Sequence, residues 1–124
     1  MITIDYKSRV PIYDQIINGI MRLKALDVLK AGDKLPSVRN MAISLGINPN
    51  TVQKAYAMLE AKGVICTVSG KGAFISEDDN AADAIIEAAK ESFEASVKSA
   101  KAMGLSPDTL RAVITKIYME ESND

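Results

Sequence analysis

The stretch 35–56 constrains the fold more than any other part of the chain, because it contains two helix starts separated by one tight turn. Ser37 is a good cap for a first helix, and Gly46 tolerates the left-handed backbone at which helices commonly end. Asn48 can cap a second helix, with Pro49 at the first helical position, where a missing N–H costs nothing. The stretch is therefore predicted to form a helix-turn-helix.

The second predicted helix has two chemically different faces. On a helical wheel its apolar side comprises Val52, Ala55, Tyr56 and Leu59. The opposite side comprises Asn50, Gln53, Lys54 and Ala57. Asn and Gln side chains can form two-point hydrogen bonds with adenine, and Lys can reach guanine or phosphate, so this face suits the major groove of DNA. Taken alone, such a polar face is more often simply solvated.

A β-hairpin is predicted directly after this helix. Residues 64–68 are rich in β-branched side chains, and residues 73–76 resume the apolar pattern after a turn. A helix-turn-helix followed by a hairpin is a winged helix, so the predicted fold class is mainly α with a small β-wing (α+β). The predicted wing tip, Gly70-Lys71-Gly72, offers a charge and bare backbone amides to a phosphate or a minor groove. The same glycines could serve the hairpin turn alone.

The chain before the motif is predicted to add a strand and a helix to the same domain. Residues 2–6 alternate between apolar and polar, which is the period of a half-buried strand. Pro11 can open a long helix that has a broad apolar stripe and ends between residues 26 and 29. Cys66, in the first strand of the wing, is predicted to be a small core or sheet residue and not a reactive thiol.

A polar, acidic break over residues 77–80 separates the front of the chain from its back. Beyond it, a helix is predicted over residues 81–103, and a last helix is predicted to follow the cap Ser106. The predicted organisation is a winged helix-turn-helix domain over residues 1–76, a linker over 77–80 and a two-helix region over 81–124.

Both predicted C-terminal helices carry an apolar stripe. Two helices of this length bury too little surface between them to form a stable domain alone. We therefore expect the stripes to pack against the same helices of a second copy, giving a two-fold homodimer, and folding back onto the winged helix is the alternative. The residues expected at the dimer interface are Ile86, Phe93, Val97, Leu110, Ile114 and Ile117.

The net charge of −1 conceals a strong asymmetry along the chain. Residues 1–76 contain ten Lys and Arg against five Asp and Glu, whereas residues 77–124 contain five against eleven. A basic front half is the electrostatic footprint of a DNA-binding module, and the acidic back half would be repelled from phosphates.

Composition argues against several other classes of protein. The chain has one Cys and no His, so an internal disulfide, a Cys/His zinc site and a His-based catalytic triad are excluded. The wing-tip glycines lack the spacing of a phosphate-binding loop, and no signal peptide or membrane span is recognisable. We expect a cytoplasmic protein that is not an enzyme and that has no metal, no cofactor and no membrane partner.

Several short motifs follow one another in a characteristic order. They are Pro11-Ile12-Tyr13 with Gln15-Ile16, Leu35-Pro36-Ser37 with Arg39, Asn48-Pro49-Asn50-Thr51-Val52, Ala55-Tyr56 with Leu59, Gly63 with Ile65, and Gly70-Lys71-Gly72 with Phe74. Together they resemble the DNA-binding domain of GntR-type bacterial transcription regulators, over about residues 2–76. The short C-terminal remainder is similar to the YtrA-like subgroup, whose members carry a pair of helices in place of a large effector-binding domain.

The resemblance implies DNA contacts at defined positions of this chain. They are Ser37, Arg39, Asn48, Pro49, Asn50, Thr51, Gln53, Lys54, Gly70, Lys71 and Gly72. The chain departs from many relatives at residues 67–69, which are not basic, and at Ala73, which stands in place of a Thr. Arg39 also suits guanine and phosphate by its own chemistry, and a surface ion pair with Asp33 is its alternative role.

The resemblance implies a sequence-specific DNA-binding transcriptional regulator. We expect a repressor that binds a palindromic operator in double-stranded DNA as a homodimer. The alternative is a winged-helix protein-interaction module that docks a partner through its apolar C-terminal stripes and does not bind DNA, although such a module would not need the basic front half. An unidentified small-molecule effector stays open as a further partner, and its site would lie near Phe93 or Tyr118.

Overall fold

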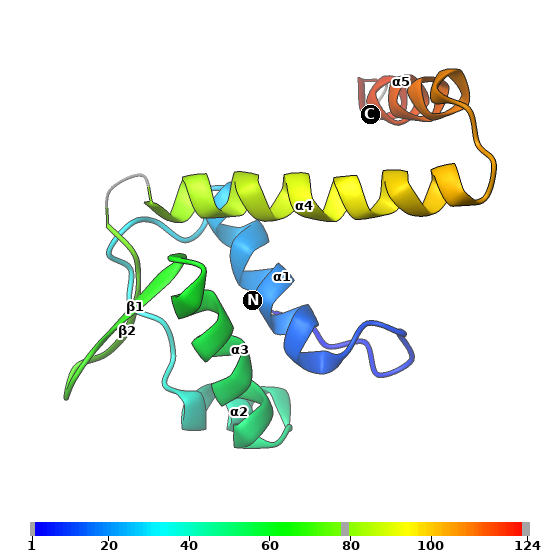
Figure 1. The fold of residues 1–124 in the computed structure, drawn as a ribbon. Coiled ribbons are helices and arrows are strands. Elements are labelled where there is room, and N and C mark those ends of the chain that lie inside the picture. The colour runs from blue at the N-terminus through cyan, green and yellow to red at the C-terminus, as the bar shows by residue number, and fades with distance from the viewer. Residues whose placement is uncertain (1, 78–79, 123–124) are drawn as a thin grey trace. The chain divides into compact units, whose positions relative to one another are not determined.

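The structure is a computed structural model that describes residues 2–77 and 80–122 (Figure 1). Within these residues the chain forms five helices and one two-stranded antiparallel sheet. They are α1 (Ile12–Ala25), α2 (Val38–Leu45), α3 (Pro49–Ala61), β1 (Ile65–Val68), β2 (Gly72–Ile75), α4 (Asn80–Ala102) and α5 (Pro107–Ser122). The predicted class, mainly α with a small β-wing, is confirmed.

The two helices of the central motif begin and end through the caps that the sequence predicts. The Ser37 Oγ accepts a hydrogen bond of 3.0 Å from the backbone N–H of Asn40, which lies in the first turn of α2. Gly46 ends that helix with a φ of 68°, a backbone conformation that favours glycine. The Asn48 Oδ1 then accepts a hydrogen bond of 2.8 Å from the N–H of Asn50 at the start of α3. Local capping therefore fixes both helix starts.

The core of the first compact unit, Met1–Ile86, lies where α3 packs against α1 and α2. The apolar face predicted for α3 is buried at all four positions, Val52, Ala55, Tyr56 and Leu59. From α1 the core receives Ile16, Ile17 and Ile20. Burial of one complete face fixes the rotation of α3 about its own axis, so the opposite face must point to solvent.

The wing is a β-hairpin whose second strand, β2, forms backbone hydrogen bonds on both of its sides. Strand β1 pairs antiparallel with β2 in a register that sets Ile65 opposite Ile75 and Val68 opposite Gly72. On the other side of β2, the N–H of Leu35 donates to the Ala73 carbonyl at 2.8 Å. The segment that leads into α2 therefore anchors the wing to the motif, a connection that the sequence analysis did not predict.

The predicted strand over residues 2–6 is wrong, because this segment has no strand conformation. Its alternation correctly indicates burial, since Ile2 and Ile4 pack against the core. At Asp5, near the end of this segment, both backbone groups bond instead to the side chain of Gln15. The Asp5 N–H donates to the Gln15 Oε1 at 2.8 Å, and the Gln15 Nε2 donates to the carbonyls of Asp5 and Val10 at 2.9 Å each.

Cys66 lies in the sheet, as predicted, but its side chain is exposed and not part of the core. It stands opposite Phe74 on β2. In β1 only Ile65 is buried.

The start of α4 belongs to the core of the first unit. Ala81 is completely buried, and Ala84 and Ile85 pack against the same cluster. The second compact unit begins within the helix, at Glu87. The predicted division into residues 1–76, a linker over 77–80 and residues 81–124 stays a prediction, and Asp78 and Asp79 of that linker lie outside the described residues.

The second unit, Glu87–Asp124, contains the rest of α4 and α5. The predicted cap Ser106 is present, since its Oγ accepts a hydrogen bond of 3.2 Å from the N–H of Thr109. Among the described residues, no helix combines the length and the apolar character that a membrane span requires.

The buried core yields a test with a matched pair of substitutions. We expect Ile20→Ala to lower the free energy of unfolding by about 2–5 kcal/mol, because the side chain is fully buried and its removal leaves a cavity. The same substitution at Ile43, which is 69% exposed on α2, should change stability by no more than about 0.5 kcal/mol. Urea denaturation followed by circular dichroism measures both, and equal losses would contradict this core.

Candidate nucleic-acid interface

The structure places all the predicted DNA-contacting residues at the surface of the first unit. Thr51 and Gly72 are half-buried, and the others are exposed. They come from three places: the start of α2, the loop before α3 together with the N-terminal half of α3, and the tip of the wing. The motif and the wing are joined through the backbone bonds of β2, so these places belong to one folded unit.

The outward face of α3 carries amide groups that the protein itself does not use. The side chains of Asn50 and Gln53 are exposed, and within the described residues neither makes a hydrogen bond. Asn50 takes part in the helix cap through its backbone N–H only. Amide side chains in this position can donate and accept at the edge of one base, which is the contact by which Asn and Gln recognise adenine.

Two predicted contacts have a structural role as well. The oxygen atoms of the Ser37 and Asn48 side chains are engaged in the caps of α2 and α3. Any contact from Asn48 to DNA would therefore use the Nδ2 amide, which can donate to a phosphate. Pro49, the first residue of α3, has no backbone N–H. It would therefore contribute to a DNA contact through its shape and not through a backbone hydrogen bond.

Arg39 does not form the ion pair considered as its alternative role. The Asp33 carboxylate accepts a hydrogen bond of 2.9 Å from the backbone N–H of Lys30. Among the described residues, the ion pairs are Arg111 with Asp108 and Lys116 with Glu120, both in α5. The Arg39 guanidinium is thus exposed at the first turn of α2, and no carboxylate in the part of the chain that the structure describes pairs with it.

Lys54 makes a contact that the sequence analysis missed. Its Nζ lies 3.8 Å from the centroid of the Tyr13 ring, within cation–π range. Tyr13 lies in the first turn of α1 and is half-buried. The contact joins residues far apart in the sequence, so no local pattern indicates it. It brings the beginning of α1 next to the outward face of α3.

The wing tip is built for a close approach of the backbone to a ligand. Lys71 is exposed between Gly70, with a φ of 76°, and Gly72, with a φ of 116°. A Cβ at Gly72 would lie 3.3 Å from the Cε of Lys34, so a larger residue would meet both strain and crowding. Lys34 and Lys71 thus place two ammonium groups along the wing.

A side-chain hydrogen bond connects the wing to the C-terminal end of α3. The Thr67 hydroxyl on β1 donates to the Glu60 carboxylate on α3 at 2.8 Å. Thr67 is one of the positions where the chain lacks the basic residue of many relatives. Here it positions β1 against α3, which is a structural role that the sequence analysis did not assign.

Comparison with known proteins identifies a matching family and several relatives. The family model described as bacterial regulatory proteins, gntR family, matches residues 10–75. The chain belongs to the GntR family.

Two curated relatives and one solved structure illustrate the likeness of this GntR-family chain. It is 49% identical to the HTH-type transcriptional repressor YtrA of Bacillus subtilis. The aligned part covers 70% of this chain and 65% of YtrA, so the chain spans slightly less than two thirds of that relative. It is 39% identical to the uncharacterised HTH-type transcriptional regulator YhcF of the same species, over 85% and 88% of the two chains. A GntR family transcriptional regulator from Listeria monocytogenes has a similar structure, with a TM-score of 0.74, 34% identity and coverage of 90% and 98%.

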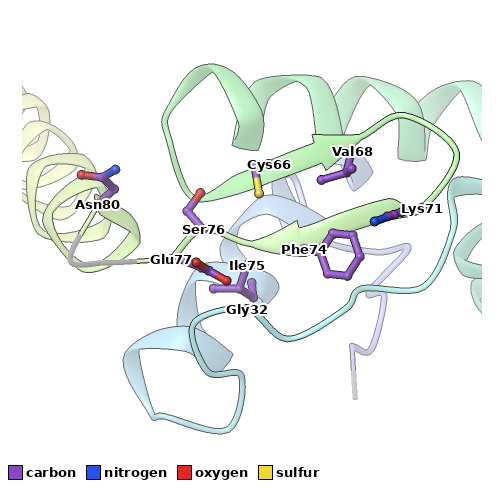
Figure 2. Close-up of a pocket in the computed structure, with 9 residues that line it drawn as sticks. All are labelled: Gly32, Cys66, Val68, Lys71, Phe74, Ile75, Ser76, Glu77 and Asn80. Atoms are coloured by element: carbon purple, nitrogen blue, oxygen red, sulfur yellow. The ribbon is translucent and has the colours of Figure 1, made fainter.

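An open pocket of about 560 Å³ lies along the wing (Figure 2). The figure shows Cys66 and Phe74 on the hairpin, and Glu77 and Asn80 where the chain leaves it. Within the described residues, no group of three or more Cys, Asp or Glu side chains could hold a metal ion. The pocket contains no residue of α3, so it is separate from the face that carries the amide groups.

The predicted dimer residues lie on the second unit with one exception. A groove of about 250 Å³ between α4 and α5 is lined by Phe93, Val97, Leu110, Ile114 and Ile117, together with Ser96, Ala100 and Val113. The exception is Ile86, which is the last residue of the first unit and is 53% exposed. Phe93 and Ile117 are each about half exposed, which leaves much apolar surface open to water.

Tyr56 holds α3 to the segment before α2 and gives the GntR-family domain a pH-dependent contact. Its hydroxyl donates to the Pro36 carbonyl at 2.7 Å. Burial raises the pKa of Tyr56 from 10.0 to about 12, because the charged phenolate is poorly solvated there. The folded protein therefore retains the Tyr56 proton more strongly than the unfolded chain does.

This difference in pKa predicts a loss of stability at high pH. The contribution of Tyr56 should be complete below pH 10 and should be lost as the pH rises toward 12, because the unfolded chain releases the proton first. Urea unfolding at a series of pH values, compared with Tyr56→Phe, isolates the effect from the other tyrosines and the lysines. Identical pH dependence in the two proteins would contradict a buried, hydrogen-bonded Tyr56 hydroxyl.

Proposed function

We propose that this chain is a sequence-specific DNA-binding transcriptional repressor that binds a palindromic operator as a homodimer. The observation that carries the proposal is the outward face of α3, where Asn50 and Gln53 expose amide groups with no hydrogen bond within the described residues. The opposite face of the helix is buried, so the backbone that carries these groups is held at a fixed orientation. Such a helix can enter a major groove with little loss of conformational entropy.

Charge supports DNA as the partner. Residues 1–76 carry twice as many basic as acidic side chains, and the exposed Arg39 has no carboxylate partner among the described residues. Contacts from Lys and Arg to phosphates would supply most of the affinity, while α3 would choose the bases. Lys71 at the wing tip suits a phosphate beside the groove that α3 enters.

The groove of the second unit supports a homodimer. It is lined almost entirely by apolar side chains, and three of them, Phe93, Val113 and Ile117, are about half exposed. A second copy presents the same groove, so a two-fold axis would let each copy cover the apolar surface of the other. Two recognition helices related in this way would read the two halves of an inverted repeat.

The role of repressor rests on the relatives. YtrA is named a transcriptional repressor, and the chain shares 49% identity with it over the aligned part. A DNA-bound dimer can block transcription by occupying a site that overlaps a promoter, without a catalytic group or a cofactor.

Selection of bound duplexes from a random DNA library tests the reading face. Wild-type protein should recover an inverted repeat, because two identical α3 helices would contact it. We expect Gln53→Ala and Arg39→Ala to lose preference at particular positions of each half, at a cost of about 1–3 kcal/mol per lost base contact.

Lys62→Ala is the control for that selection, since Lys62 is an exposed cation at the other end of α3. It should keep the wild-type base preferences. If Gln53→Ala and Arg39→Ala recovered the same sites as wild type, the outward face of α3 would not be the reading face. If wild-type protein recovered no sequence at low salt, a protein-interaction module would replace the repressor as the better account.

The proposed dimer has its own matched pair of substitutions. Ile114→Asp places a charge in the apolar groove of the second unit, and we expect it to shift the protein from dimer to monomer. Ala112→Asp adds the same charge two residues earlier, on the opposite side of α5, and should remain dimeric. Sedimentation at micromolar concentration measures the mass of each, and a monomeric wild-type protein would refute the dimer.

A further inference from the structure

A structured loop over residues 5–10 precedes α1 and lies beside the motif (Figure 1). Gln15 organises it, since the Gln15 side chain bonds the backbone of Asp5 on one side and the carbonyl of Val10 on the other. Within the loop, the Ser8 Oγ accepts a hydrogen bond of 3.1 Å from the N–H of Val10. The loop is therefore held in one conformation by bonds that do not involve the side chains of its two cations, Lys7 and Arg9.

Two contacts from different parts of the motif hold this loop next to the face proposed to read DNA. The Tyr6 hydroxyl donates to the carbonyl of Leu45 at 3.2 Å, at the last residue of α2 before the turn into α3. The Lys54 ammonium lies 3.8 Å over the ring of Tyr13, which follows the loop in the first turn of α1. The loop is thus tied both to the end of α2 and, through Tyr13, to the outward face of α3.

The cations of the loop are available to an anionic partner. Lys7 and Arg9 are exposed, and within the described residues neither pairs with a carboxylate. The Asp5 carboxylate turns back to accept a hydrogen bond of 3.0 Å from the backbone N–H of Lys7. Asp14, in the first turn of α1, forms no ion pair with either cation.

We propose that Lys7 and Arg9 form a phosphate-binding surface that grips the DNA backbone on the side of α3 opposite the wing. In the view of Figure 1, α3 lies between the wing and this loop. With Lys71 on one side and the loop on the other, the phosphates on both sides of the groove would be neutralised while α3 contacts the bases. This inference rests on the proposed DNA binding and adds to it a second, sequence-independent contact.

The test compares two double variants of the full chain that remove the same charge. Lys7→Ala with Arg9→Ala removes the cations of the loop. Lys30→Ala with Lys62→Ala removes two exposed lysines away from the loop, one in the segment after α1 and one at the C-terminal end of α3. The probe is a duplex that wild-type protein recovers from a random library, and its affinity is measured over a range of salt concentrations.

We expect the loop variant to bind roughly tenfold more weakly at moderate salt, and the slope of log K against log salt to become shallower by about 0.9 for each lost phosphate contact. Its base preferences should stay as in wild type, because phosphate contacts do not read sequence. The control variant should keep the wild-type slope. Phosphate ethylation interference should show the loss of a few phosphate contacts in the loop variant alone.

The outcomes separate this inference from the proposed function. A loop variant with the wild-type slope would overturn the phosphate contact and leave the DNA-binding repressor in place. An equal loss in the control variant would also overturn it, because general charge would then be the cause. A wild-type protein that binds no duplex at low salt would overturn both. Urea unfolding of the loop variant should match wild type, since neither side chain makes a hydrogen bond within the described residues.

Discussion

The packing of α3 against α1 is the interaction on which the proposed interface depends. Val52 and Leu59 on α3 and Ile16 and Ile20 on α1 are completely shielded from water, so the rotation of α3 about its axis has one stable setting. The outward direction of Gln53 follows from this burial and not from any interaction of Gln53 itself. A loss of core packing would therefore affect DNA recognition without any change in the residues that touch DNA.

Specific polar contacts extend this fixed orientation to the neighbouring elements. The Tyr56 hydroxyl joins α3 to the segment before α2, and the Thr67 hydroxyl joins β1 to Glu60 on α3. The bonds between β2 and the segment before α2 close the arrangement. Each contact is weak alone, but together they make the motif and the wing one unit, so that base contacts and phosphate contacts can form in a single register.

Much of the fold was predictable from the sequence because its signals are local. Ser37, Gly46 and Asn48 act through their own neighbours along the chain, and the buried face of α3 follows from helical periodicity. The predicted strand over residues 2–6 was wrong because alternation reports burial and says nothing about a bonding partner, which here is Gln15. The contacts of Tyr6 with Leu45 and of Tyr13 with Lys54 could not be predicted, because they join distant residues through tertiary structure.

The central claim is that α3 reads base edges in the major groove, and chemical methylation of a bound duplex tests it most directly. Methylation by dimethyl sulfate reports on guanine N7 in the major groove and on adenine N3 in the minor groove. The account predicts that wild-type protein protects guanine N7 atoms in both halves of an inverted repeat. Protection confined to the minor groove, or absent while the protein stays bound, would contradict it.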